Sequence, residues 1–486
     1  MYKRALTIDE IALIPSELKE VMRDYSNAGF EIFLVGGGVR NILVDKIPQN
    51  CDLTTNATPQ QSIEILKKRS PFYNNDFGTV SINISISGKD EVYEITTYRS
   101  EKEYSDYRRP DEVVWGQTLE EDVIRRDFTI NAIVIGEKDG KWELLDMVKG
   151  LDDFEKGVIR SVGDPEKRFT EDALRLIRAI RFAARLGFQI EEKTLSAICS
   201  QANLLEKISK ERVRDELLRI IQTNYPADGV QLLISTGLME SIVPELLEGR
   251  GVEQGGHHKL TVLEHELESL RYCSSPDALV RLASLMHDIG KPRSQRFKCR
   301  SCSKLYKKLD GDFYKCEACG FNQPVKKMIT FYGHEVIGAR MTENIAQRLR
   351  FTNKQIEKLV TLVRRHMFTY QPEMTDAAIR RLIRKVGKEN INDMILLRIA
   401  DRKGSGSNTT SWRFIELQRR IGEQLYEPME VRDMVVDGKD VMEVLKVGPG
   451  PIIGKVLSDL FEEVIEDTSR NNREYLLSRI KEVDRG

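Results

Sequence analysis

A change of hydrophobic pattern near residue 170 divides this chain of 486 residues. Before it, FEIFLVG (30–36) is typical of a strand that ends in glycines, and VSINISI and VYEITTY alternate around the turn SGKDE. After it, apolar residues recur at helical spacing, beginning with TEDALRLIRAIRFAARLGF. The sequence therefore predicts an α/β head with a mixed sheet, followed by mostly all-α regions that are interrupted once, at 297–322.

Composition narrows the class of protein. The formal net charge is -1 although Lys and Arg supply 75 residues, so a surface that binds polyanions must come from local clusters. The first twenty residues contain no apolar core of signal-peptide length, and no run of about 18 apolar residues follows. We expect a cytoplasmic protein that does not enter a membrane, and in that reducing compartment the clustered cysteines favour a metal over disulfides.

The stretch LVGGGVRNILVDKIPQNCDLTTNATP is the first candidate site. Gly36 and Gly37 let backbone N–H groups approach a phosphate, and Arg40 adds a cation one turn later. Glycines that serve only a strand-turn-helix geometry are the alternative. Asp52 follows alone where phosphoryl-transfer chemistry needs two carboxylates, and Glu94 lies on a strand that could be its neighbour.

Two further segments carry polar clusters. EEDVIRRDFTINAI brings Arg125, Arg126, Asp127 and Asn131 together before an apolar strand. RFTEDALRLIRAIRF places Asp172, Arg175 and Arg178 on one polar side of a helix. Such a side is usually a solvated face, but this one suits recognition of a base edge together with phosphates.

In this order, these segments and the loop YEITTYRSEKEYSDYRRPDEV resemble the motif series of the class II tRNA nucleotidyltransferases, over the first 190 residues. The family includes CCA-adding enzymes and bacterial poly(A) polymerases. The resemblance implies Mg²⁺ on a D-x-D pair, which activates the RNA 3′-hydroxyl for attack on the α-phosphate of a nucleoside triphosphate. It also implies tRNA, CTP and ATP as partners.

The resemblance assigns roles to residues of this sequence. Glu94 would help the catalytic pair at positions 50 and 52, and Asp172 and Arg175 would select CTP or ATP through the Watson–Crick edge. The nucleotide would be held by Gly36, Gly37, Arg40, Arg126, Asp127, Asn131 and Arg178. The resemblance of the loop implies full CCA addition. Poly(A) polymerase activity is the alternative, but relatives with that activity tend to carry long basic tails, unlike the ending DRG here.

The sequence departs from the family at the metal site. Asn50-Cys51-Asp52 replaces the D-x-D pair, and Asn41 stands where an Asp usually follows Gly-Gly-x-Val-Arg. Losing one negative charge predicts weaker metal binding and impaired transfer. Three interpretations follow: a naturally degenerate head, a deliberately inactivated variant, or a site rescued by Glu94 or Asp45.

A second set of candidate ligands lies in the helical part. LEHELESL, LMHDIGK, FYGHEVIGA, VRRHMF and RIADRKG supply His265, His287, Asp288, His334, His366 and Asp401. Histidines and aspartates from several helices can build a cage for divalent metal ions. The set resembles the HD phosphohydrolase superfamily, which implies hydrolysis of phosphomonoesters or cyclic phosphodiesters; a scaffold without activity is the alternative.

A cysteine cluster interrupts this helical part. Cys299 and Cys302 are followed, after thirteen residues, by Cys316 and Cys319, a spacing that strongly indicates a zinc ribbon with a closed Zn²⁺ site. The ribbon could contact RNA or could be a stabilising element with a solvated lysine-rich face. The residues suited to RNA are Lys298, Arg300, Lys304, Tyr306, Lys307, Lys308 and Tyr314.

We therefore predict five parts. They are a nucleotidyltransferase head (1–140), a helical neck and body for base recognition and RNA binding (141–250), a split HD domain (251–296 and 325–405), a zinc-ribbon insertion (297–324) and a helical RNA-binding tail (406–486). The competing hypothesis is a phosphohydrolase or RNA-binding protein whose head has lost catalysis.

Overall fold

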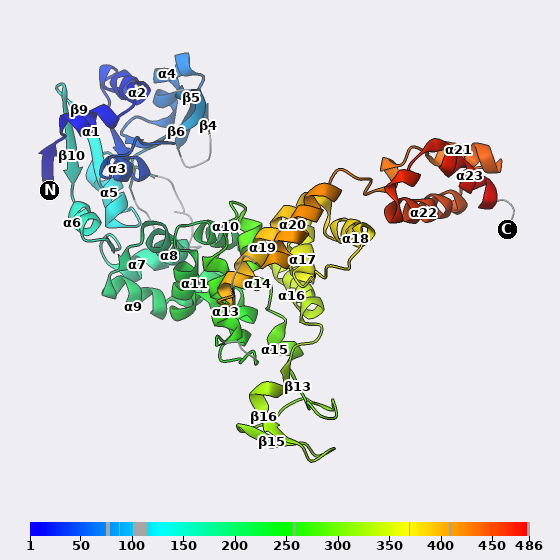
Figure 1. Ribbon diagram of the computed structural model, residues 1–486. Helices are drawn as coiled ribbons and strands as arrows, with labels where there is room; N and C mark the ends of the chain where they lie inside the picture. The colour runs from blue at the N-terminus through cyan, green and yellow to red at the C-terminus, as the bar shows by residue number, and fades with distance from the viewer. Residues whose placement is uncertain are drawn as a thin grey trace. The chain divides into compact units, whose positions relative to one another are not determined.

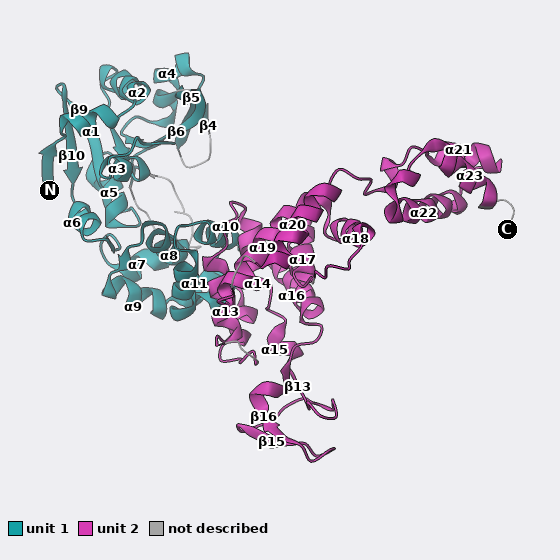
Figure 2. Cartoon of the chain, viewed as in Figure 1, with its two compact units in different colours: residues 1–242 teal, residues 243–486 magenta. Residues whose placement is uncertain are grey.

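The computed structural model describes residues 1–73, 78–86, 88–100, 114–255, 259–368, 370–407 and 411–483 (Figure 1). The chain forms two compact units, 1–242 and 243–486 (Figure 2). The resemblance links the loop 93–113 to full CCA addition, and most of that loop lies outside the described residues. No helix in the described ranges is long and apolar enough to cross a bilayer.

The first unit begins with an eight-stranded sheet in the order β1-β10-β9-β2-β3-β6-β5-β4. The strands are β1 (Tyr2–Ala5), β2 (Ile32–Val35), β3 (Asp52–Thr55), β4 (Phe72–Tyr73), β5 (Thr79–Ile86), β6 (Lys89–Thr97), β9 (Val134–Lys138) and β10 (Lys141–Asp146). The pair β3–β6 is parallel and its described neighbours are antiparallel, so the predicted mixed sheet is confirmed. The parallel register sets Asp52 directly opposite Glu94.

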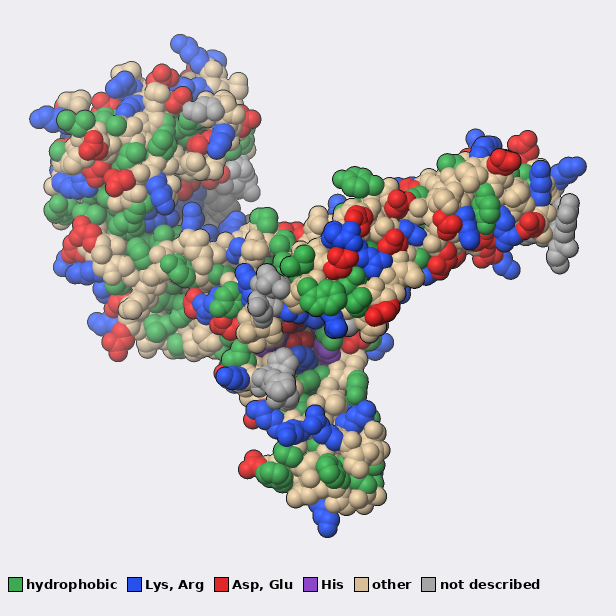
Figure 3. Space-filling model, in the orientation of Figure 1, with side chains coloured by type: hydrophobic (Ala, Val, Ile, Leu, Met, Phe, Trp, Pro, Cys, Tyr) green, Lys and Arg blue, Asp and Glu red, His purple; other side chains and the backbone are tan. Residues whose placement is uncertain are grey.

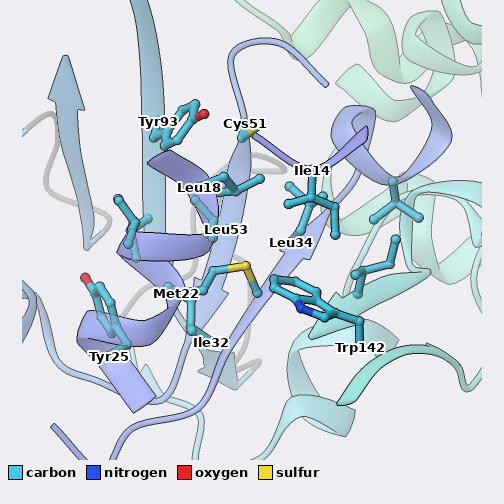
Figure 4. Close-up of a cluster of buried hydrophobic side chains, with 14 of the residues drawn as sticks. Ile14, Leu18, Met22, Tyr25, Ile32, Leu34, Cys51, Leu53, Tyr93 and Trp142 are labelled. Carbon is cyan, nitrogen blue, oxygen red and sulfur yellow. The ribbon is translucent and has the colours of Figure 1, made fainter. Parts of the chain in front are cut away.

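Helix α2 (Ser16–Asn27) covers one face of this sheet. It buries Leu18, Met22 and Tyr25 at helical spacing. These side chains pack with apolar residues of β2 and β3, including Leu34 and Leu53 (Figure 4). Burial of about 1.5–3 kcal/mol per large apolar side chain holds both strands in place. The ends of β2 and β3 therefore form a rigid support for the polar residues that follow.

The rest of the first unit is mainly helical. Its helices are α1 (Ile8–Leu13), α3 (Gly37–Ile42), α4 (Pro59–Ile65), α5 (Leu119–Ile124), α6 (Gly150–Glu155), α7 (Pro165–Glu171), α8 (Leu174–Leu186), α9 (Glu192–Ser200), α10 (Lys210–Ile221), α11 (Pro226–Ser235) and α12 (Leu238–Ile242). Helix α8 packs on α10 and α11. A Cβ on Gly229 would come within 2.8 Å of the Ala184 Cβ, so α11 approaches α8 closely because this residue is glycine.

The second unit contains a helical bundle with a small β insertion. The bundle helices are α13 (Val262–Arg271), α14 (Ala278–Met286), α15 (Lys291–Ser294), α16 (His334–Arg348), α17 (Asn353–Arg365), α18 (Asp376–Val386), α19 (Ile391–Gly404) and α20 (Trp412–Gln424). The insertion, called the ribbon below, has strands β13 (Arg296–Lys298), β14 (Leu305–Tyr306), β15 (Phe313–Lys315), β16 (Asn322–Pro324) and β17 (Ile329–Thr330).

Three helices end the second unit: α21 (Gly438–Leu445), α22 (Pro451–Glu466) and α23 (Arg473–Val483). They share a small apolar core that includes Val441, Phe461 and Ile480. Arg380 of α18 donates from Nε to the backbone oxygen of Ile465 at 2.9 Å, which anchors α22 to the bundle.

Candidate functional site

A cavity of about 490 Å³ in the first unit collects most of the predicted nucleotide-binding residues. Its walls are Gly36, Gly37, Arg40, Asn41, Gln49, Asn50, Asp52, Arg126, Asp127, Asn131, Arg178, Arg181, Phe182 and Arg185. Among the residues to which the resemblance assigns a nucleotide-binding role, Asp172 and Arg175 do not line it. Segments about 140 residues apart in the sequence therefore meet in one hollow.

The glycine turn forms one wall. Strand β2 ends at Val35, and Gly36 has φ +69° before α3 begins at Gly37. This left-handed backbone favours glycine, and a Cβ there would lie 3.6 Å from the Oδ2 of Asp52. The turn thus exposes the peptide backbone beside Asp52 and carries Arg40 into the cavity.

A hydrogen-bonded network fixes the polar wall. The carboxylate of Asp127 accepts bonds from Arg178 Nη2 at 2.6 Å and Nε at 3.0 Å, and from Asn131 Nδ2 at 2.8 Å. Arg40 in turn donates to the Asn131 side-chain oxygen. Burial alone would raise the pKa of Asp127, but Arg178 and Asn131 outweigh it and hold that pKa well below its usual range. Asp127 is therefore an ionised anchor that orients two arginines.

The cavity has an excess of positive charge. Five arginines line it against two aspartates. Burial and the nearby Arg185 lower the pKa of Arg40 to about 10, and burial and Arg178 lower that of Arg181 to about 10. Both groups stay charged at neutral pH, so the cavity suits a polyphosphate anion.

Sequence reasoning missed several wall residues. Arg181, Phe182 and Arg185 continue the α8 face that begins at Arg178, at spacings of three, four and seven residues. The Phe182 ring centroid lies 4.7 Å from the Arg181 guanidinium and 5.2 Å from that of Arg40. Their spacing from Arg178 could have revealed them, because it continues the cationic side of the helix that the sequence predicts. Gln49 offered no such signal.

The two residues predicted to select the base lie at the start of the same helix. The Asp172 Oδ1 accepts a bond from the Leu174 amide at 3.1 Å. Arg175 Nη2 donates to the backbone oxygen of Arg125 at 2.9 Å. Neither contact tests base selection, which stays a prediction.

The register of β3 and β6 sets Asp52 opposite Glu94, and Asp52 lines the cavity whereas Glu94 does not. Desolvation and the nearby Glu94 raise the pKa of Asp52, although its side chain still reaches solvent, and Arg126 opposes this shift. Two carboxylates side by side are hard oxygen ligands that suit Mg²⁺. Asp45 does not line the cavity.

Asn50 is tied to the neighbouring strand. It has φ +46°, a left-handed conformation that Asn tolerates. Its Oδ1 accepts a bond from the Val92 amide at 3.2 Å, and its own amide donates to Glu91 Oε2 at 3.1 Å. The amide side chain thus has a structural partner on β6, while its missing charge leaves Asp52 and Glu94 as the acidic pair.

A second cavity, of about 440 Å³, lies in the second unit. It is lined by all six predicted ligands: His265, His287, Asp288, His334, His366 and Asp401. They come from α13, the end of α14, α16, the end of α17 and α19. The bundle thus assembles a cluster from residues spread over 137 positions.

The ligand atoms form two groups that share Asp288. Its Oδ2 lies 3.4 Å from His265 Nε2 and 3.2 Å from His287 Nε2, and its Oδ1 lies 3.3 Å from His334 Nε2. His366 Nε2 lies 3.7 Å from that Oδ1, and Asp401 Oδ1 lies 3.2 Å from His265 Nε2. This donor set would hold two divalent cations, and Asp288 belongs to both groups of ligands.

The outer nitrogens of three histidines point to backbone oxygens. His287 Nδ1 lies 2.8 Å from the Ser284 oxygen, His334 Nδ1 lies 2.8 Å from the Phe331 oxygen, and His366 Nδ1 lies 2.7 Å from the Val363 oxygen. A proton on each Nδ1 leaves Nε2 free to coordinate.

The ribbon cysteines form the third site. The Sγ–Sγ distances are 3.7 Å for Cys299–Cys319 and 3.6 Å for Cys302–Cys316, and all four sulfurs lie within 4.8 Å of one another. A tetrahedral ion with Zn–S bonds of about 2.3 Å needs sulfur separations of about 3.8 Å. The four thiols therefore fit such an ion.

Two neighbouring side chains support the sulfurs. Gln323 Nε2 donates to Cys299 Sγ at 3.1 Å, and the Tyr306 hydroxyl lies 3.1 Å from Cys316 Sγ. The hydrogen bond from Tyr306 lowers the pKa of Cys316 to about 6, which favours the thiolate that a metal needs.

Family models match successive parts of the chain. Residues 32–160 match the "Poly A polymerase head domain" and 187–249 match the "Probable RNA and SrmB- binding site of polymerase A". Residues 260–403 match the "HD domain", and 337–480 match "tRNA nucleotidyltransferase domain 2 putative".

Individual proteins agree with these models. The chain is 29% identical to the CCA-adding enzyme of Enterococcus faecalis over 97% of this chain and 98% of that protein. It is 40% identical to the CCA-adding enzyme of Lactobacillus helveticus, where the match covers 49% of this chain and 57% of that protein.

Solved structures share the fold. The CCA-adding enzyme of Bacillus stearothermophilus in complex with CTP has a TM-score of 0.66 at 23% identity, covering 99% of this chain and 98% of that one. The Thermotoga maritima CCA-adding enzyme complexed with tRNA has a TM-score of 0.54 at 16% identity, covering 99% of both chains. The solved structures show the shared fold, and the matched domains together with the CCA-adding relatives show that this chain is related to the tRNA nucleotidyltransferases and carries an HD domain.

Proposed function

We propose that this chain adds C, C and A to the 3′ end of tRNA from CTP and ATP. The observation that carries the proposal is the arginine-lined cavity beside Asp52 and Glu94, which suits a nucleoside triphosphate next to a magnesium site. The relatives named CCA-adding enzymes support this substrate choice, and the cytoplasm, where tRNA is processed, is the proposed location.

The wall residues have distinct parts in the reaction. Arg40 and Arg178, oriented by Asp127, hold the triphosphate, and Asp52 and Glu94 hold Mg²⁺. When bound, Mg²⁺ supplies charge stabilisation and activation of the attacking oxygen. The RNA 3′-oxygen bonds to the α-phosphorus as the bond to pyrophosphate breaks, and its proton leaves to solvent. Asp172 and Arg175 select the base in this proposal.

We further propose that Asn50 reduces the activity without abolishing it. Glu94 supplies a second carboxylate opposite Asp52, which favours the interpretation of a rescued site over a degenerate head. The missing charge of Asn50 still weakens metal binding, because an amide oxygen contributes no net attraction.

Incorporation of labelled CTP and ATP into tRNA that lacks its CCA end tests the proposal. The unmodified chain is expected to incorporate both nucleotides, and Asn50→Asp is expected to do so faster. If neither incorporates nucleotide, the transferase activity is rejected. If only Asn50→Asp works, Glu94 does not rescue the site.

A second activity is metal-dependent hydrolysis of phosphate esters at the HD cavity. The observation that favours it is the convergence of four imidazoles on Asp288 and Asp401. These residues would hold two divalent ions, which supply an activated water when bound. Lys291, whose Nζ lies 2.5 Å from Asp288 Oδ2, adds a cation beside the substrate phosphate.

Hydrolysis of a 2′,3′-cyclic phosphate by the unmodified chain and by His287→Ala tests this second activity. The variant is expected to lose hydrolysis and part of its bound metal. Hydrolysis that survives His287→Ala would reject the assignment. In the ribbon, Zn²⁺ is the proposed ion, and one zinc per chain in protein purified without chelator is expected.

A further inference from the structure

A strip of side chains connects the ribbon to the mouth of the HD cavity. Tyr332 lies between β17, the last ribbon strand, and His334, and it lines the cavity although its side chain is 65% exposed. Lys298, at the end of β13, donates from Nζ to the Tyr332 hydroxyl at 3.4 Å. The same Nζ lies 5.6 Å from the centre of the Tyr332 ring. The ribbon therefore contributes directly to the rim of the cavity.

The rim and the interior differ in chemistry. Inside, Lys291, Arg398 and Arg402 stand among the metal ligands and suit a phosphate. The exposed residues of the lining are Tyr332, Met367 and Ser407, of which Tyr332 and Met367 carry the large side chains, Met367 being 56% exposed. The face of the Tyr332 ring and the flexible apolar side chain of Met367 offer no hydrogen-bond donor to a phosphate, but they suit the face of a base.

Single-stranded RNA matches this arrangement. Its bases stack on exposed aromatic rings, and its phosphates pair with lysine. A contact between Lys298 and the Tyr332 ring orients both groups before RNA arrives. Figure 3 shows Lys and Arg side chains gathered on the ribbon, near the place where histidine reaches the surface. A phosphate ester without a base would occupy the interior and leave the rim unused.

We infer that Tyr332 and Lys298 form a stacking platform that recognises a base near the 3′ end of single-stranded RNA whose terminal phosphate lies in the HD cavity. The ribbon then makes the site selective for RNA ends over small phosphate esters. This inference rests on the hydrolytic activity proposed above for the HD cavity.

The test compares two substrates that carry the same reacting group. One is a short oligoribonucleotide that ends in a 2′,3′-cyclic phosphate, and the other is glycerol 1,2-cyclic phosphate, which has no base. Loss of a stacking contact is expected to lower the ratio of kcat/KM values, RNA over glycerol, at least about fivefold in Tyr332→Ala. Tyr332→Phe keeps a ring and is expected to keep the ratio.

Phe313→Ala is the matched control. Phe313 lies on β15 of the ribbon, is also 65% exposed and does not line the cavity, so its removal is expected to leave the ratio unchanged. A ratio unchanged in Tyr332→Ala, or lowered equally in Phe313→Ala, would overturn the platform.

A cross-linking experiment separates the platform from the hydrolysis. An oligoribonucleotide with a 3′-terminal 4-thiouridine is irradiated with the full chain, and cross-linked peptides are located by mass spectrometry. A cross-link at Tyr332 or Lys298 supports the platform even if the unmodified chain hydrolyses neither substrate, a result that would reject only the proposed hydrolysis. Cross-links confined to other parts of the chain would overturn the platform.

Discussion

Replacing Glu94 by Gln removes one of the two carboxylates at the proposed magnesium site while keeping the size of the side chain. Paired strands lie about 4.8 Å apart and Asp52 is opposite Glu94, so we take about 5 Å as the separation of their charges. At an effective dielectric constant of about 20, two such charges interact by about 3 kcal/mol. In Glu94→Gln, a cation bound between the two side chains loses an attraction of at least this order, which corresponds to a rate about 10²-fold lower.

The expected result is therefore a drop of about 10²-fold in kcat/KM for CTP at limiting Mg²⁺. The Asn50→Asp variant has a third carboxylate, so Glu94→Gln in that background is expected to lower kcat/KM only about tenfold. The difference between the two backgrounds corresponds to a coupling free energy of about 1.4 kcal/mol between positions 50 and 94. The assay is single-nucleotide incorporation into tRNA over a Mg²⁺ titration. Glu143→Gln, on β10 of the same sheet and outside the cavity, is the control.

Equal losses in both backgrounds would refute the idea that Glu94 compensates for Asn50. No loss in either would remove Glu94 from the site. An independent readout is the pKa of Asp52, which is expected to fall in Glu94→Gln because a repelling charge has gone.

Three further predictions follow from buried charges and ligands. Asp122→Ala should lower the stability of the first unit by about 3–5 kcal/mol in urea unfolding, because it leaves the side chains of Arg125 and Arg126 without their buried partner. Those arginines outweigh burial and depress the pKa of Asp122. The contribution of Asp122 to the free energy of unfolding is therefore present above the unfolded-state pKa of about 4 and is lost at lower pH. A free energy of unfolding that stays constant down to pH 2 in the unmodified chain would contradict this. Because Asp288 belongs to both groups of ligands, Asp288→Ala should remove both divalent ions of the HD cavity, whereas Asp401→Ala should remove only one. The metal stoichiometry of the two variants measures this, and equal losses would contradict a shared role of Asp288. Cys302→Ser should abolish the bound zinc and expose the ribbon amides to hydrogen exchange while α16 stays protected, whereas a fully retained zinc would reject the site.

The sequence predicted features that depend on local order along the chain. The glycine turn with Arg40 follows a strand, and the six HD ligands occur on helices in an order that the resemblance anticipated. The four ribbon cysteines needed only their spacing. In each case the residue types themselves supply the chemistry, so their identity was enough to propose the site.

Features that depend on strand register and on packing between elements could not be predicted from the sequence. Gln323 of β16 donates to Cys299, which follows β13, and no spacing of the cysteines reveals this contact between two parts of the ribbon. Arg181 is held beside Phe182 by Glu216 of α10, a contact between helices distant in sequence. The bond from the Val92 amide to Asn50 likewise depends on a turn conformation that composition does not specify.

The 3′-terminal sequence of the product RNA distinguishes CCA addition from poly(A) addition and from an inactive head. A tRNA that ends at the discriminator nucleotide is incubated with the unmodified chain, CTP, ATP and Mg²⁺, and the ends are sequenced. C, C and A are expected to be added in this order, after which extension stops. Unextended ends, or tails of many adenosines, would contradict it.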